Sequence, residues 1–573
     1  MEQPQYLAHL ESSIPEDAWG YTVSSYTVVL EAWRRGLKIK FINENRRKSE
    51  LTYTISNGEK EHVFSVARGD LVPREAILTC KDKNKTKDVL LKHNVPTPVG
   101  KEFNSEATEG DYVKYGDELG YPLVVKPVDG TGGKGVITGI QNKEALLSSI
   151  DYLKTDLNVN NIIIERYVEG KDYRLYVLDG KVIGAFTRDR ANVIGDGKSS
   201  IEQLVAKKNK LRGQNPALKG RSKILLNKEA KVLLEEKQYD FKSVPGKGEK
   251  VYLNTKNNVS SGGDPTDATD FFKDSIKQIA VDAAKAIPGL IQGGVDMIID
   301  DNQEHGYVIE VNSRPHIRAH MFPMQGKARD IPKEVIDFYF PETKGQQVEN
   351  KLFFDFDIIY KSFVEGVCGE FTLPTYPESE IILKRYELTG VSEKEQMSKF
   401  CSLRARRYQL NGYMKGIGAS KSSLVLVGTS EDIQTLLKDV KAKYKNIQLS
   451  EKVRKSPVRI GFSTINMNRN TSKKSSTTSN KGKGSKASKK VVSDDIKVTK
   501  NPNDPNIDGY FPLKLTEGSK KSVSKKKTTN KKTSTSLNKN TTKATQKEAR
   551  FKNRTSRTAT KPLRVVSRML KRK

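Results

Sequence analysis

Cysteine, tryptophan and long apolar runs are all scarce in this chain of 573 residues, which has three cysteines and two tryptophans. The cysteines Cys80, Cys368 and Cys401 form no metal or redox spacing, and an odd number cannot all pair. No run approaches the roughly 18 apolar residues of a membrane-spanning helix, and the first residues lack the pattern of a signal peptide. We therefore expect a soluble, cytoplasmic protein in a reducing compartment, without a transmembrane segment.

Acidic and apolar residues are scarce from Thr464 onward. Residues 464–573 contain 31 lysines and arginines against six acidic residues, which is +25 of the chain's net +32. This segment has too little apolar surface to offset the conformational entropy that folding would cost. We therefore predict a disordered basic tail that binds polyanions by counterion release. Two less polar islands, 507–515 and 562–570, indicate a docking peptide and a basic amphipathic helix, or in each case a merely solvated tail.

The rest of the chain has a Gly-rich loop after a predicted strand at 121–127. Glycine lacks a Cβ and tolerates positive φ, so this loop can approach a polyphosphate closely, and Lys126 and Lys134 can offset its charge. Alone, such a loop is more often a plain hairpin turn. The loop glycines with this predicted role are Gly130, Gly132, Gly133 and Gly135.

Two further predicted strand pairs carry polar residues at their ends. The first, at 162–177, can present backbone groups of Tyr167 and Val168 to adenine and the Asp172 carboxylate to ribose hydroxyls, although an ordinary hairpin with a charged turn has the same pattern. The second, at 294–299 and 307–312, carries three oxygen-bearing side chains, which suit the hard cation Mg²⁺. These three residues are Asp296, Glu310 and Asn312.

The order and spacing of these elements resemble the ATP-grasp superfamily of carboxylate–amine ligases. Segments 188–198, 243–253, 258–264 and 320–323 extend the likeness, so that residues 80–345 resemble the ATP-grasp module of bifunctional glutathione synthetase and cyanophycin synthetase. The resemblance implies that Lys126 and the loop hold the phosphates of ATP. It also implies nucleotide and metal roles for the following residues: Glu165, Tyr167 and Val168 at adenine, Asp172 at ribose, Asp296, Glu310 and Asn312 at Mg²⁺ or Mn²⁺, and Arg188 beside the transferred phosphate.

The activity implied by this resemblance is ATP-dependent amide formation through an acyl phosphate, with ADP and phosphate as products. The substrates would be an amino acid, a small peptide or a polymer of amino acids. Arg314 and Arg318 are either holders of a substrate carboxylate or surface charges. Asn254 and Arg190 depart from the family, which usually has arginine and proline there. A silent nucleotide-binding scaffold with a polyanion-binding tail, a nucleic-acid binder and a homo-oligomer all stay open.

The predicted fold class is α/β (α+β), in four parts. A small α/β domain at 1–79, with a helix at 26–36 and a strand at 38–42, precedes the ATP-grasp core at 80–345. Strands and helices at 352–452 resemble a ferredoxin-like acylphosphatase, with Ser398 and Gly416 in place of its usual catalytic pair. The basic tail at 464–573 follows. A lysine face at Lys85 and Lys87 is expected to stay solvated rather than reach the nucleotide.

Overall fold

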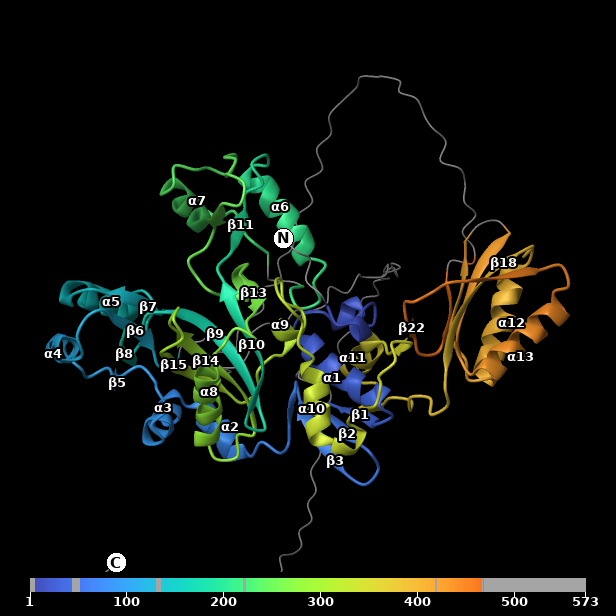
Figure 1. The fold of residues 1–573 in the computed structure, drawn as a ribbon, viewed down its shortest axis with the longest axis horizontal. Coiled ribbons are helices and arrows are strands. Elements are labelled where there is room, and N and C mark those ends of the chain that lie inside the picture. Colours follow the sequence, from blue (N-terminus) through green and yellow to red (C-terminus); the bar gives the residue numbers. More distant parts are fainter. Residues whose placement is uncertain are drawn as a thin grey trace, which may run out of the picture. The chain divides into compact units, whose positions relative to one another are not determined.

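The computed structural model describes residues 6–43, 52–129, 135–219, 223–417, 420–465 and 467. Almost all of the predicted tail, with both of its islands, and the predicted phosphate-loop residues Gly130, Gly132, Gly133 and Lys134 therefore lie outside the described residues. Helices and strands are both abundant, as the predicted α/β class requires (Figure 1). No helix in the described part is long and apolar enough to cross a membrane.

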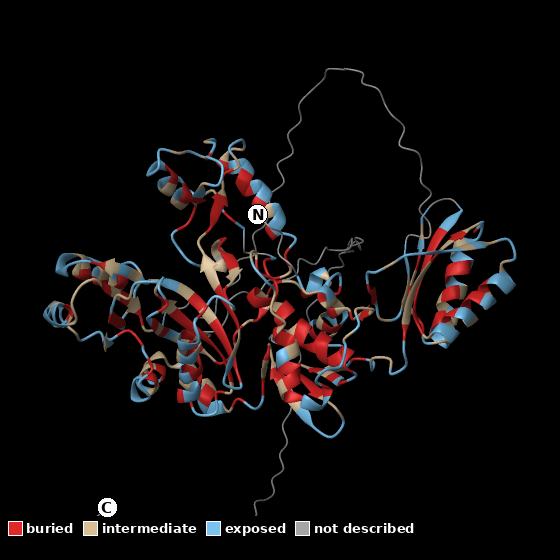
Figure 2. Cartoon of the chain, in the orientation of Figure 1, coloured by how far each residue is buried: buried red, intermediate tan, exposed pale blue. Residues whose placement is uncertain are grey.

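The first sheet has the strand order β17-β1-β2-β3-β4. The predicted helix and strand near the N-terminus are present as α1 (Val23–Arg34) and β1 (Lys38–Ile42). Nearly every residue of α1 is buried, so it is a core helix rather than a surface one (Figure 2). The other strands are β2 (Thr52–Ser56), β3 (Glu61–Ser65), β4 (Arg68–Gly69) and β17 (Glu370–Thr372).

The strand β17 lies far along the chain from the sheet that it completes. Its Phe371 pairs with Phe41 of β1, and α1 lies beside α10 (Ile331–Tyr339). Residues of β16 (Leu352–Phe353) and α11 (Phe356–Val364) belong to the same apolar core as α1. Residues 352–372 thus pack with the first sheet, which differs from the predicted unit at 352–452.

The second sheet has the order β5-β8-β6-β7, and α4 and α5 cover one of its faces. Its central strand β8 begins with three isoleucines, whose branched side chains suit a buried strand. The elements of this part are β5 (Gly100–Phe103), α4 (Glu109–Leu119), β6 (Leu123–Pro127), β7 (Ile137–Ile140), α5 (Lys143–Thr155) and β8 (Ile162–Arg166). The helices α2 (Arg74–Lys81) and α3 (Lys83–Lys92) precede them in the chain and have their buried apolar residues in the core of the third sheet.

The third sheet, β13-β10-β9-β14-β15, packs one face against α8. A small two-stranded sheet of β11 and β12 with α6 and α7 has its own apolar core. The elements are β9 (Lys171–Leu178), β10 (Lys181–Asp189), β11 (Asn192–Ile194), α6 (Ile201–Arg212), α7 (Lys228–Glu235), β12 (Lys250–Tyr252), β13 (Asp264–Asp267), α8 (Asp274–Ala286), β14 (Gln292–Ile299), β15 (Gly306–Asn312) and α9 (Arg318–Met321).

The last described sheet has the order β21-β18-β20-β19-β23. Its chain order is βαββαβ, with both helices packed on one apolar core, which is a ferredoxin-like arrangement. A relationship to acylphosphatase stays a prediction. The elements are β18 (Ile382–Thr389), α12 (Lys394–Arg407), β19 (Asn411–Gly416), β20 (Lys421–Gly428), α13 (Ser430–Lys443), β21 (Gln448–Lys452) and β23 (Phe462–Ile465). The short strand β22 (Val458–Arg459) is not part of this sheet and pairs in parallel with β16.

Candidate functional site

The third sheet has one apolar face and one polar face because side chains alternate along each strand. On β9, Tyr173 and Leu175 point to the core with α8, whereas Asp172 and Arg174 lie on the opposite face. On β14, Val295 and Met297 belong to the same core. Asp296 therefore lies on the polar face, in register with Arg174 of β9.

A β-bulge at Ile309 places the remaining acidic residue on this polar face. Asp296 is paired with Glu310, but the next residue, Met297, is paired with Val308, so Ile309 is an extra residue in β15. Val308 and Val311 both lie in the core, three residues apart. Strict alternation from Val308 would turn Glu310 into the core, and the bulge prevents this.

Asp296 is held by two arginines. Arg174 donates from Nε to Oδ1 at 2.5 Å and from Nη2 to Oδ2 at 2.6 Å, and Nη2 of Arg188 lies 3.1 Å from Oδ2. Burial alone would raise the pKa of Asp296, which is 7% exposed, but Arg174 and Arg188 hold it below its usual value. Asp296 is therefore ionised, and a bound cation would have to compete with Arg174 for its oxygens.

Arg188 lies between two carboxylates without satisfying all of its donors. Its Nε is 3.2 Å from Oδ1 of Asp172, within ion-pair distance. Its Nε and Nη2 are buried and make no well-aligned hydrogen bond to the described residues. Because buried donors are normally satisfied, this guanidinium is suited to bind an anion on the polar face.

The oxygen donors on β14 and β15 fit Mg²⁺. Glu310 lies next to Asp296 across the strands, and Asn312 follows two residues later on the same face. The Nδ2 atom of Asn312 is buried without a hydrogen-bond partner among the described residues. Among the described residues, no group of three or more His, Cys, Asp or Glu side chains could hold a metal, and a Mg²⁺ site that includes the Asn312 amide oxygen stays a prediction.

A second charged cluster lies on the second sheet, around Glu165. Oε2 of Glu165 is 2.5 Å from Nζ of Lys126, and Oε1 is 2.8 Å from Nζ of Lys87. Burial alone would raise the pKa of Glu165, which is 6% exposed, but Lys126 and Lys87 lower it. The prediction of a solvated lysine face is wrong for Lys87, whose side chain is 17% exposed, and correct for Lys85, which is 71% exposed.

Lys83 lies near both clusters. Burial lowers its pKa, while Glu310, Asp129 and Glu165 act in the opposite direction. Lys83 is thus within electrostatic range of the metal strand β15 and of the Glu165 cluster on β8. The sequence alone did not indicate Lys83 as a site residue, although Lys83 and Lys87 are four residues apart and so share one face of α3.

Comparison with known proteins identifies this region. Residues 80–214 match the family model of the RimK-like ATP-grasp domain. The chain carries a RimK-like ATP-grasp domain. It is 34% identical over 331 residues to the glutathione biosynthesis bifunctional protein GshAB of Clostridium perfringens, a match that covers 56% of this chain and 41% of that protein.

Two other known proteins are similar to this chain. Cyanophycin synthetase from Synechocystis is 32% identical over 340 residues, which cover 57% of this chain and 37% of that protein. The crystal structure of a bifunctional glutathione synthetase from Pasteurella multocida is 28% identical, with a TM-score of 0.46, over 56% of this chain and 43% of that one. The chain thus spans less than half the length of the curated relatives that it matches.

The other predicted residues of the ATP-grasp domain are placed as follows. Gly135, the last glycine of the predicted phosphate loop, has φ +75° and lies close to Pro127. The backbone N–H of Tyr167 donates to the carbonyl of Pro122 at 3.0 Å, and Val168 follows it in the connector after β8. Arg314 lies just beyond β15, where its Nη1 donates to Oγ of Ser65 at 3.1 Å.

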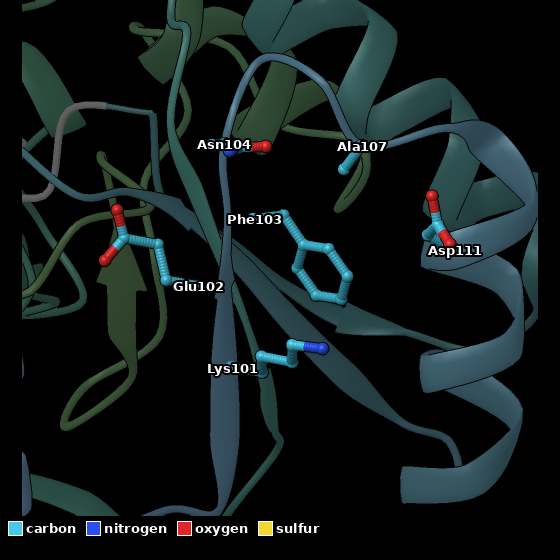
Figure 3. Close-up of a pocket in the computed structure, with 6 residues that line it drawn as sticks. All are labelled: Lys101, Glu102, Phe103, Asn104, Ala107 and Asp111. Carbon is cyan, nitrogen blue, oxygen red and sulfur yellow. The ribbon is translucent and has the colours of Figure 1, made fainter.

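A pocket of about 430 Å³ lies elsewhere on the second sheet, between β5 and the start of α4 (Figure 3). None of the predicted nucleotide or metal residues lines it. Its lining is mostly polar, and the strand β5 is at the edge of its sheet. The residues that line this pocket are Lys101, Glu102, Phe103, Asn104, Ala107 and Asp111.

Proposed function

We propose that this chain is an ATP-dependent carboxylate–amine ligase that uses Mg²⁺. The observation that carries the proposal is the row of Arg174, Asp296 and Glu310 across three strands, with the Arg188 guanidinium beside it, ion-paired to Asp172 and Asp296. Such a face offers oxygen donors to a cation and guanidinium groups to phosphate, which is what phosphoryl transfer requires. The activities in the names of GshAB and cyanophycin synthetase agree with this proposal.

We propose the following roles for the site residues. Asp296, Glu310 and Asn312 hold Mg²⁺, which when bound offsets the charge of the ATP phosphates. Lys126 and the loop that follows it bind those phosphates, and Glu165 orients the Lys126 ammonium group. The nucleoside lies along the connector after β8, with Tyr167 and Val168 at adenine and Asp172 at ribose.

In the proposed reaction, a substrate carboxylate oxygen attacks the γ-phosphorus of ATP, and ADP leaves. The amine nitrogen of the second substrate then attacks the acyl carbon, phosphate leaves, and the nitrogen loses a proton to give the amide. Arg188 stabilises the charge on the transferred phosphate through its Nε and Nη2 donors. The acid and the amine are an amino acid, a small peptide or a polymer of amino acids.

The decisive measurement is ADP release from Mg-ATP by the full chain, against panels of amino acids and small peptides. We expect release only when a carboxylate and an amine substrate are both present. Glu310→Gln should lower kcat/KM at least about 100-fold, because a lost metal-ligand carboxylate removes on the order of several kcal/mol of transition-state stabilisation. The matched control is Glu304→Gln, in the exposed turn between β14 and β15. Equal activity of the two variants would contradict the metal assignment, and a wild-type chain that binds ATP without turnover would favour a silent scaffold.

We also propose that the basic segment 464–573 binds polyanions and that the protein is cytoplasmic. The net charge of +25 in that segment supports the first proposal. All three cysteines are free thiols, which agrees with a reducing compartment. We expect the protein to be retained on immobilised heparin, with retention falling steeply as the salt concentration rises. Retention should be lost when residues 468–573 are removed, whereas ligase activity should survive the removal.

A further inference from the structure

The turn between β3 and β4 contains a strained residue. Ser65 is paired with Arg68, so Val66 and Ala67 form a two-residue hairpin turn. Val66 has φ +61°, in the left-handed region. Turns of this kind usually have glycine or asparagine there, and a β-branched residue at positive φ is strained by about 1–3 kcal/mol. Such strain persists only where the surroundings over-determine the conformation, and it is concentrated at functional sites.

Buried hydrogen bonds hold this turn in place. The Tyr53 hydroxyl donates to the carbonyl of Val66. Nε2 of Gln292, a fully buried side chain, donates to the carbonyl of Ala67 at 2.5 Å, and the Tyr339 hydroxyl donates to Oε1 of Gln292 at 3.0 Å. Gln292 is the first residue of β14, the strand that carries Asp296. The turn is therefore fixed relative to the predicted metal strand.

Two arginines, one from each side of this contact between the first and third sheets, are bound to serine hydroxyls. Nη1 of Arg68 donates to Oγ of Ser313 at 3.3 Å, and Nη1 of Arg314 donates to Oγ of Ser65 at 3.1 Å. Ser313 and Arg314 directly follow Asn312. One guanidinium group from the first sheet and one from the segment after β15 are thus held by reciprocal contacts with serine hydroxyls, in a segment that follows the predicted Mg²⁺ ligand Asn312 in the chain.

The surroundings of these arginines are positively charged. Burial, followed by the charges of Arg318 and Arg314, lowers the pKa of His316 to about 3. Arg318 also stacks on the ring of Tyr21, with its guanidinium carbon 3.7 Å from the ring centroid. His316 is therefore neutral near pH 7, and the segment 314–318 carries the two positive charges of Arg314 and Arg318.

We propose that Arg68 and Arg314 form a carboxylate-binding clamp for one of the two ligation substrates, and that the strained turn at Val66 exists to deliver Arg68 to it. The proposal rests on the ligase function proposed above. A carboxylate accepts paired hydrogen bonds from guanidinium donors, so the clamp would anchor a carboxylate that does not react. That group would be the main-chain carboxylate of an amino acid or the C-terminus of a peptide. The clamp adds Arg68, a residue of the first sheet, to the substrate site.

The test uses the full chain with a substrate pair that supports ADP release. Arg68→Met should raise the KM for the clamped substrate about 30-fold, as expected for a lost charge-assisted hydrogen bond, and leave the KM for ATP unchanged. The wild type should prefer the free acid of that substrate over its carboxamide, and Arg68→Met should lose this preference. Arg74→Met removes an exposed arginine at the start of α2 and should behave as wild type. Free amino acids and dipeptides compared in the same assay distinguish the two sources of the carboxylate.

If Arg68→Met does not fold, Arg68→Lys is the variant to measure. It keeps the charge but not the planar fork of donors, so its KM should lie between those of the wild type and Arg68→Met. An active Arg68→Met with wild-type KM values and an intact acid preference would overturn the clamp alone, and so would a wild-type KM in Arg68→Lys. A wild-type chain that releases no ADP with any pair would overturn the ligase function, and the clamp with it.

Discussion

Replacing Glu165 by Gln should destabilise the second sheet at neutral pH. The change keeps the shape of the side chain but removes the charge that neutralises Lys126 and Lys87, 2.5 and 2.8 Å away. Removing one partner of a buried ion pair costs about 3–5 kcal/mol. The two lysine side chains are 16% and 17% exposed and can turn partly toward water, so we expect the lower end, about 3 kcal/mol at pH 7.

The effect should depend on pH in a defined direction. Because Lys126 and Lys87 hold the pKa of Glu165 below its ordinary value, ionised Glu165 stabilises the folded state above the pKa of the unfolded chain. This stabilisation is lost as the pH falls through the lowered folded-state pKa. The difference between wild type and Glu165→Gln should therefore be full near pH 7 and shrink below the ordinary glutamate pKa of about 4.3.

Amide hydrogen exchange along β8 measures this locally and does not require the whole chain to unfold in one step. Glu169→Gln, an exposed neighbour in the connector after β8, is the matched control and should keep wild-type protection. Protection of β8 in Glu165→Gln within about 0.5 kcal/mol of wild type at pH 7 would refute the reasoning, since surface changes have effects of that size. A difference that is constant down to acidic pH would refute the ionic explanation.

Two further predictions concern other parts of the chain. Asp264 is 1% exposed and neutralises Lys208 and Arg212. Asp264→Asn should therefore lower the free energy of unfolding by about 3–5 kcal/mol, measured as a fall in thermal stability. An unchanged thermal transition would show that the two buried cations have other counterions. The full chain should not hydrolyse acetyl phosphate. Ser398 stands in place of one residue of the usual acylphosphatase catalytic pair, is buried, and donates its hydroxyl to the Glu395 carbonyl within α12. Phosphate release above the buffer rate would contradict this prediction.

Motif order in the sequence was enough to predict the α/β class, the ATP-grasp relationship and the two adjacent strands that carry Asp296 and Glu310. Details that depend on contacts distant in sequence were not predictable. The bulge at Ile309 is one example, because period-2 alternation alone would place Val308 and Glu310 on the same face. Arg174 is another, since nothing local indicates that it binds Asp296, 122 residues away.

The pairing of Lys87 with Glu165 was missed for a related reason. A lysine on a polar helix is normally solvated, and only the approach of α3 to β8 reverses this preference. The strained turn at Val66 also has no sequence signal, because valine is not a turn residue. In both cases tertiary contacts override the local preference of the residue.

The pairing of Phe371 with Phe41 has a consequence for how the protein is made. A ribosome synthesises β1 long before β17, so one edge of the first sheet stays unpaired while the ATP-grasp region emerges. During that interval β1 presents open backbone groups, and Phe354 and Phe356, which later pack against Phe41, are still absent. The nascent N-terminal domain is therefore exposed to chaperone binding or mispairing until residue 372 has left the ribosome.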